Sequence, residues 1–206
     1  MDVLSLLILV TIVIYFILRD KGGRLQEIST DHLPDSFIVL DLETTGLDAN
    51  RHEIIEIAAI RYQKGTDTHK TFQSLVKPTR KVPKKITELT GITQEMLVES
   101  GQALPNTLVD FASFIGQLRL VTFNAEFDMA FLHTANAKHG LPALLNPVSC
   151  ALKMARRAWP RRKSFRLIDL ASDGKFADGR AHRALEDARR ALLVYAAAVA
   201  KLKSVE

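Results

Sequence analysis

A chain of 206 residues with 47% hydrophobic content is long enough for one compact domain and an appendage. Its net charge of +5 fits a polyanionic partner or an anionic membrane surface and does not decide between them. The single cysteine, Cys150, excludes an intramolecular disulfide, and one thiolate alone makes no metal cage. We therefore interpret Cys150 as a small core residue.

The chain begins with an apolar segment, residues 3–18, that contains no charged side chain. A helix over this segment would span roughly 24 Å, a little less than the hydrocarbon core of a bilayer. A cleaved signal peptide would need a basic start, and a buried core helix would show a polar face; neither feature is present. We predict a membrane anchor over residues 1–20, followed by a polar linker over residues 21–35.

The charges that flank this segment predict its orientation. Asp2 precedes the apolar residues, whereas three basic residues follow them: Arg19, Lys21 and Arg24. By the positive-inside rule, the C-terminal domain then lies in the cytoplasm. The sequence thus predicts a single-pass protein of the inner (cytoplasmic) membrane, with the membrane as one partner.

Residues 36–206 are predicted to form an α/β domain with a mixed sheet. The continuous apolar run at residues 37–40 is typical of a strand covered on both faces. Residues 54–62 and 71–76 predict two further strands, which the turn at Lys64-Gly65 makes antiparallel neighbours. A helix capped by Asn106, a buried strand and four more helices then follow, with these bounds: strand 120–123 and helices 125–138, 150–157, 167–172 and 183–203.

Two acidic residues end the first predicted strand. Asp41 and Glu43 are two residues apart, so their side chains leave the same face. Adjacent carboxylates repel each other unless a cation lies between them, and Mg²⁺ prefers oxygen ligands. Farther along, Asn124 and Asp128 share one face at the start of a predicted helix. Acidic residues in an ordinary loop, and a charge that favours the helix dipole, are the alternative interpretations of these positions.

His182 and Asp187 form a second informative pair. At about 100° per residue, five positions place them on different helix faces, so they converge only if His182 precedes the helix. The turn signal at Asp178-Gly179 supports that placement. A solvated surface histidine is the alternative.

Residues 37–47, 124–128 and 182–187 together resemble the three exonuclease motifs of the DEDD superfamily. Because a histidine stands five residues before the last aspartate, the motifs resemble those of the branch typified by the epsilon proofreading subunit of bacterial DNA polymerase III. The resemblance covers roughly residues 36–199. It implies an RNase H-like mixed sheet flanked by helices, and a metal-dependent 3′→5′ exonuclease that releases nucleoside monophosphates from single-stranded DNA.

The resemblance also implies roles for particular residues. His182 would deprotonate the attacking water, and two Mg²⁺ or Mn²⁺ ions would be bound by Asp41, Glu43, Asp128 and Asp187. The terminal nucleotide would contact Thr44, Thr45, Gly46, Leu47 and Asn124. One position departs from the pattern, because Thr90 stands where relatives often have histidine.

Two basic clusters carry a further set of alternatives. They comprise Lys77, Arg80, Lys81, Lys84 and Lys85, and, around Trp159, Arg156, Arg157, Arg161, Arg162, Lys163 and Arg166. Each cluster can bind nucleic-acid phosphates, form a solvated face or contact anionic lipid. An RNase of the same family and a catalytically silent nucleic-acid-binding module are the alternative functions. A polymerase partner is possible for this branch, but the sequence favours a stand-alone enzyme.

Overall fold

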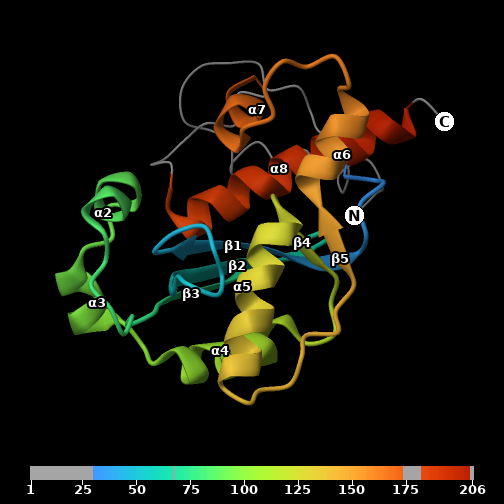
Figure 1. Ribbon diagram of the computed structural model, residues 1–206. Helices are drawn as coiled ribbons and strands as arrows, with labels where there is room; N and C mark the ends of the chain where they lie inside the picture. The colour runs from blue at the N-terminus through green and yellow to red at the C-terminus, as the bar shows by residue number, and fades with distance from the viewer. Residues whose placement is uncertain (1–29, 67, 174–181, 205–206) are drawn as a thin grey trace.

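The apolar run that begins at Phe37 forms the central strand of a five-stranded mixed sheet (Figure 1). The computed structural model describes residues 30–66, 68–173 and 182–204. The strand order is β3-β2-β1-β4-β5. Strands β2 and β3 pair in antiparallel fashion on one side of β1, and β4 and β5 continue the sheet in parallel on the other. The strands are β1 (Ser36–Thr44), β2 (Ile54–Gln63), β3 (Lys70–Leu75), β4 (Leu120–Thr122) and β5 (Val148–Cys150).

Alternate residues of β1 enter two separate cores, because side chains of a strand alternate between its faces. Ile38 and Leu40 pack with residues of α4 (Leu104–Ile115) and α5 (Ala125–Lys138). Phe37 and Val39 pack against the opposite helix, α8 (Ala184–Lys203). The sheet is therefore covered on both faces, which explains why β1 is apolar throughout (Figure 1).

The remaining helices flank this arrangement. Helices α6 (Ala151–Ala158) and α7 (Leu167–Asp173) pack on α8. Helices α2 (Lys84–Thr90) and α3 (Gln94–Ser100) adjoin a small apolar cluster that includes Ile92 and Leu97. The sequence predicted neither α2 nor α3.

Two local predictions need correction. Helix α4 begins at Leu104 with Ala103 as its N-cap, so Asn106 is not the cap. Pro105 explains the earlier start, because its fixed φ suits the first helical turn. In addition, residues 148–150 form the edge strand β5 before α6 starts, and Cys150 is the N-cap of that helix.

A membrane-spanning element is not found among the described residues: none of their helices is both long and apolar enough to cross a bilayer. The longest, α8, carries Glu186, Asp187, Arg189 and Arg190 in its first two turns. The predicted inner-membrane, single-pass localisation and the membrane partner are therefore corrected. The predicted anchor, residues 1–20, lies outside the described residues, as does the linker up to residue 29.

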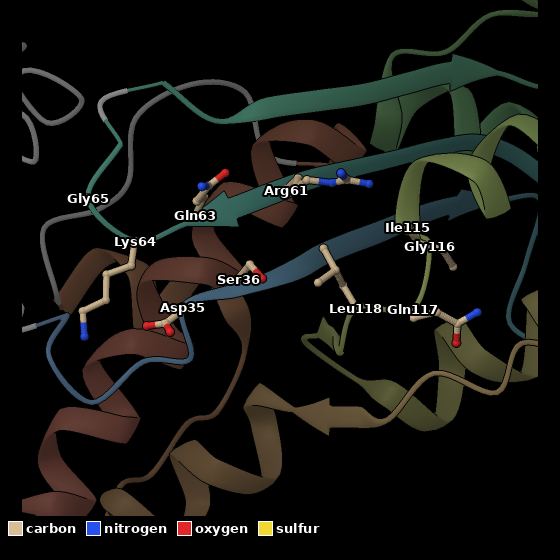
Figure 2. Close-up of a pocket in the computed structure, with 10 residues that line it drawn as sticks. All are labelled: Asp35, Ser36, Arg61, Gln63, Lys64, Gly65, Ile115, Gly116, Gln117 and Leu118. Carbon is tan, nitrogen blue, oxygen red and sulfur yellow. The ribbon is translucent and has the colours of Figure 1, made fainter.

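A pocket of about 590 Å³ lies where β1 begins and β2 ends (Figure 2). Its lining includes Asp35, Arg61, Lys64 and the C-terminal end of α4. The Arg61 guanidinium donates a hydrogen bond to the backbone carbonyl of Phe114 and lies 5.2 Å from the centre of the Phe114 ring. The pocket thus involves the junction between β2 and α4, at the end of β1 opposite Asp41 and Glu43.

Candidate active site

Two carboxylates project from the C-terminal half of β1. Asp41 and Glu43 occupy alternate positions of the strand and therefore share a face. The Glu43 residue is 8% exposed, and Asp41 is half-buried. In the sheet register, Glu43 lies opposite Glu56 of β2, which is completely buried. This end of the central strand therefore concentrates negative charge.

Asp187, in the first turn of α8, joins the two strand carboxylates. One carboxylate oxygen from each of Asp41, Glu43 and Asp187 can be chosen so that all three lie within 4.8 Å of one another. That spacing allows a single cation to contact all three residues. Because every donor is a carboxylate oxygen, the site fits a hard divalent cation such as Mg²⁺ or Mn²⁺.

Asp128 approaches the same cluster from α5. Its side chain is 3% exposed and accepts hydrogen bonds from the Thr122 hydroxyl and the Leu42 backbone amide. The Leu42 amide lies between the two acidic residues of β1, and the negative charge of Asp128 raises the pKa of Asp41. Asp128 therefore lies beside the cluster, although it is not one of the three mutually close carboxylates.

Burial and mutual repulsion make it costly for these acids to be ionised together. Burial, followed by the charges of Asp187 and Glu56, raises the pKa of Glu43 to about 8. Burial also raises the pKa of Asp128 to about 7 and that of Asp41 well above its ordinary value. A bound divalent cation would remove this repulsion. Perturbed carboxylates gathered at one strand end are typical of functional sites.

His182 precedes α8, as its convergence with Asp187 requires. Its backbone N–H donates to Asp187 Oδ2 at 3.0 Å, so the two residues are in direct contact. The residue is exposed, and its φ of 60° lies in the left-handed region that non-glycine residues seldom adopt. Such backbone strain persists only where the surroundings enforce it, and it is concentrated at functional sites.

The turn after β1 presents one large apolar side chain to solvent. The Thr44 hydroxyl donates to the Gly46 carbonyl at 2.6 Å, and the Thr45 hydroxyl accepts a hydrogen bond from the Glu53 amide at 2.9 Å. Both threonines are buried, whereas Leu47 is 87% exposed. Of these predicted nucleotide contacts, Leu47 is therefore the side chain most accessible to a ligand.

The remaining predicted contact, Asn124, and the position that departs from the family pattern, Thr90, differ in accessibility. Asn124 is exposed at the N-cap of α5, where its side chain makes no capping hydrogen bond. Thr90, which replaces the histidine often found in relatives, is 1% exposed. Its hydroxyl donates to the Ile86 carbonyl and accepts from the Ile92 amide. Thr90 thus stabilises the end of α2 through local hydrogen bonds.

Three residues that the sequence analysis did not single out also adjoin the cluster. Glu56 accepts hydrogen bonds from the Arg183 side chain, and Arg190 Nη1 lies 2.6 Å from Asp187 Oδ1. Glu56 could have been noticed, because a charged residue interrupts the otherwise apolar segment 54–60. The partners of Glu56 and Arg190 could not be inferred from composition or spacing alone.

The basic clusters are only partly free to bind a ligand. Arg162 bonds to Asp173 at 2.6 Å and donates to the Ser164 carbonyl, and Trp159 packs beside a small core that includes Leu170 and Val194. All the other basic members are exposed: Lys77, Arg80, Lys81, Lys84, Lys85, Arg156, Arg157, Arg161, Lys163 and Arg166.

A five-stranded mixed sheet with three carboxylates close enough to share one cation at the end of its central strand fits a metal-dependent hydrolase of phosphodiesters. Residues 38–195 match the Exonuclease (RNase_T) family. The chain belongs to that family, and it is a 3′→5′ exonuclease. The metal-dependent exonuclease predicted from the sequence is thereby confirmed.

Individual relatives agree with this assignment. The chain is 38% identical over 160 residues to the DNA polymerase III subunit epsilon of Aquifex aeolicus, covering 77% of this chain and 78% of that protein. Other relatives are PolC-type DNA polymerases III, of which the chain spans only 9% to 12%.

Solved structures show the same fold. E. coli exonuclease I in complex with a dA16 oligonucleotide aligns with a TM-score of 0.68 at 18% identity, over 78% of this chain and 40% of that one. The nuclease domain of 3′hExo, a DEDDh family member bound to rAMP, aligns with a TM-score of 0.68 at 22% identity, over 85% of this chain and 95% of that one.

Proposed function

We propose that residues 36–206 form an exonuclease domain that degrades single-stranded DNA and releases nucleoside monophosphates. The observation that carries this proposal is the close approach of the Asp41, Glu43 and Asp187 carboxylates in a site where their charges repel. The dA16 oligonucleotide in the structure of E. coli exonuclease I supports DNA as the substrate. The cofactor in this proposal is a pair of Mg²⁺ or Mn²⁺ ions.

The ligands of these ions would be Asp41, Glu43, Asp128 and Asp187. Divalent cations bound there would stabilise the charge that develops on the entering and leaving oxygens of the phosphodiester. Asp187 is oriented for this task by the His182 amide and by Arg190. Asp128 is oriented by Thr122. The side chains that hold the ions are thus fixed from several elements of the fold.

His182 would accept the proton of the attacking water. Histidine ordinarily titrates near neutral pH, which suits a general base. Its place immediately before α8 puts its backbone in contact with a proposed metal ligand, Asp187. The exposed Leu47 would contact the terminal base, and Asn124 would bind the same nucleotide from α5, together with Thr44, Thr45 and Gly46.

Digestion of a 5′-labelled single-stranded oligonucleotide by the full chain tests this proposal. A ladder that shortens from the 3′ end in Mg²⁺ or Mn²⁺, and that stops with EDTA, is expected. Asp41→Asn removes a proposed ligand with little change of shape, so it should abolish cleavage. Asp110→Asn, an exposed acid on α4, is the matched control and should retain activity. Cleavage by Asp41→Asn at the wild-type rate would refute the metal assignment.

A second arm of the experiment compares DNA with RNA of the same sequence. The rAMP in the structure of 3′hExo makes RNA the competing substrate class. Faster digestion of RNA than of matched DNA would replace DNA as the proposed substrate while leaving the metal site unchanged. Binding of either strand without any cleavage would instead indicate a catalytically silent module.

A further inference from the structure

Glu56 is a completely buried carboxylate near the start of β2, and both of its oxygens are bonded. Arg183 donates to it through Nη2 at 2.9 Å and through Nε at 3.3 Å. The amide of Ala184 donates at 3.1 Å, and Gln73 Nε2 donates at 2.8 Å. Burial alone would raise the pKa of Glu56, but these hydrogen bonds lower it. The carboxylate is therefore held as an anion.

These bonds fasten the start of α8 to the sheet. Arg183 is the N-cap residue of the helix, and Ala184 supplies its first helical amide. The Arg183 side chain makes no local cap, so Glu56 satisfies an amide that the helix cannot satisfy itself. A carboxylate at this position also interacts favourably with the helix dipole. The contact joins segments far apart in the chain at one point beside Glu43.

His182 immediately precedes Arg183, and two contacts fix the backbone at this point. Its own amide is bonded to Asp187, and the next residue is bonded to Glu56. His182 is the one described non-glycine residue with a positive φ. A left-handed conformation costs about 1–2 kcal/mol for such a residue, so it needs fixed neighbours.

An ion pair with one completely buried member contributes little to stability alone, because desolvation of the buried charge offsets much of the attraction. Its place at the junction of β2 and α8 points to a second purpose. We propose that the Glu56–Arg183 pair positions His182 beside Asp187 of the carboxylate cluster for the hydrolytic step. Arg183 and Glu56 are then positioning residues that act through His182, and this inference rests on the proposed function.

The consequence for catalysis is geometric. A general base must lie within hydrogen-bond reach of the proton that it accepts. A displacement of about 1 Å can cost about 100-fold in rate. Loss of the ion pair would free the residues around His182 while leaving Asp41 and Glu43 on the rigid central strand. The rate of the chemical step should therefore suffer more than substrate affinity.

Arg183→Gln in the full chain tests this inference. The substitution removes the positive charge and the guanidinium group that donates two hydrogen bonds to Glu56. We expect kcat to fall about 10–100-fold, the range typical when a residue that orients a functional side chain is lost. KM should change by less than about twofold. Arg189→Gln is the matched control, since it removes an arginine of the same helix whose ion pair with Glu186 is exposed; its kcat should match that of the wild type.

A double-mutant cycle identifies the residue through which Arg183 acts. In a His182→Ala background, Arg183→Gln should change kcat by less than about twofold, because no imidazole remains to be positioned. Arg183→Lys, which keeps the charge but not the two-pronged contact, should restore part of the wild-type kcat. Thermal unfolding of each variant confirms that it is folded.

Other outcomes would overturn the inference. An equal fall in kcat with and without His182, or a raised KM at unchanged kcat, would show that Arg183 acts on substrate or on the fold. If neither Arg183→Gln nor Arg183→Lys folds, the pair is structural and the inference fails. If the wild-type chain itself releases no nucleotides, the proposed function has failed independently of this ion pair.

Discussion

Arg190, which is 2% exposed, places its guanidinium against Asp187, with Nη1 2.6 Å from Oδ1. Both residues belong to α8, three positions apart, so they meet across one turn of the helix. The opposite oxygen of Asp187 accepts from His182. A proposed metal ligand is thus oriented from two sides before any cation binds.

Arg190→Met should destabilise the protein. It leaves Asp187 partly buried without its cationic partner, and the loss of one member of a buried ion pair typically costs about 3–5 kcal/mol. Urea unfolding should show the decrease. Arg189→Met, on the exposed side of the same helix, should change the free energy of unfolding by less than about 1 kcal/mol. Equal effects of the two substitutions would contradict a structural role for the buried pair.

The stability of the metal-free protein should fall as pH rises. The pKa of Glu43 is raised from 4.5 to about 8, so in this interval the folded state binds more protons than the unfolded chain. The protonated Glu43 carboxyl therefore stabilises the folded state fully below pH 4.5, and this stabilisation is lost as pH rises through 8. Urea unfolding in EDTA from pH 5 to pH 9 measures this slope.

Two further samples check the cause of that slope. Glu43→Gln cannot ionise at this position and should make the decline shallower; Asp41 and Asp128, whose pKa values are also raised, account for the remainder. Saturating Mn²⁺ should also flatten it, because a bound cation stabilises the ionised carboxylates. A decline of the same slope in Glu43→Gln and in the wild type would assign the pH dependence entirely to other groups.

Substitutions at His182 should separate catalysis from backbone strain. Both His182→Ala and His182→Gly should lower kcat by about 10²–10⁴, because each removes the proposed base. Glycine adopts a φ of 60° without steric cost, so His182→Gly should be more stable than His182→Ala by about 1 kcal/mol. Paired activity assays and thermal melts test both statements. A more stable alanine variant would argue against the left-handed conformation.

Leu47→Ala should affect substrate binding and leave stability unchanged. The Leu47 side chain is 87% exposed, so its removal should alter the free energy of unfolding by less than about 0.5 kcal/mol. KM for a single-stranded oligonucleotide should rise several-fold if this side chain contacts the terminal base. Leu145→Ala, which truncates a leucine that is 88% exposed, is the matched control and should leave KM unchanged.

The sequence predicted the central parts of the fold well. The short apolar run at residues 37–40 identified β1, since a strand covered on both faces is apolar at successive positions. The regular spacing of Asp41 and Glu43 then placed their side chains together. The 20-residue helix α8 was equally clear because of its length and alanine content. Features that depend on local periodicity could therefore be predicted from the sequence.

Short elements and long-range contacts could not be predicted from the sequence. A strand of three residues, such as β5, is too short to show alternation, and Pro105 moved the start of α4 away from the predicted cap. The contact between Glu56 and Arg183 joins residues that are 127 positions apart, and no local pattern specifies it. An apolar segment of suitable length also led to the inner-membrane prediction, which the described helices do not support.

Asp187 enters the carboxylate cluster from α8, the last helix of the described chain, whereas Asp41 and Glu43 come from the first strand. During synthesis the two strand carboxylates leave the ribosome long before their helical counterpart. The three-residue cluster can form only after α8 has docked on the sheet. An incompletely translated chain should therefore lack nuclease activity, so cleavage is withheld until the whole domain has folded.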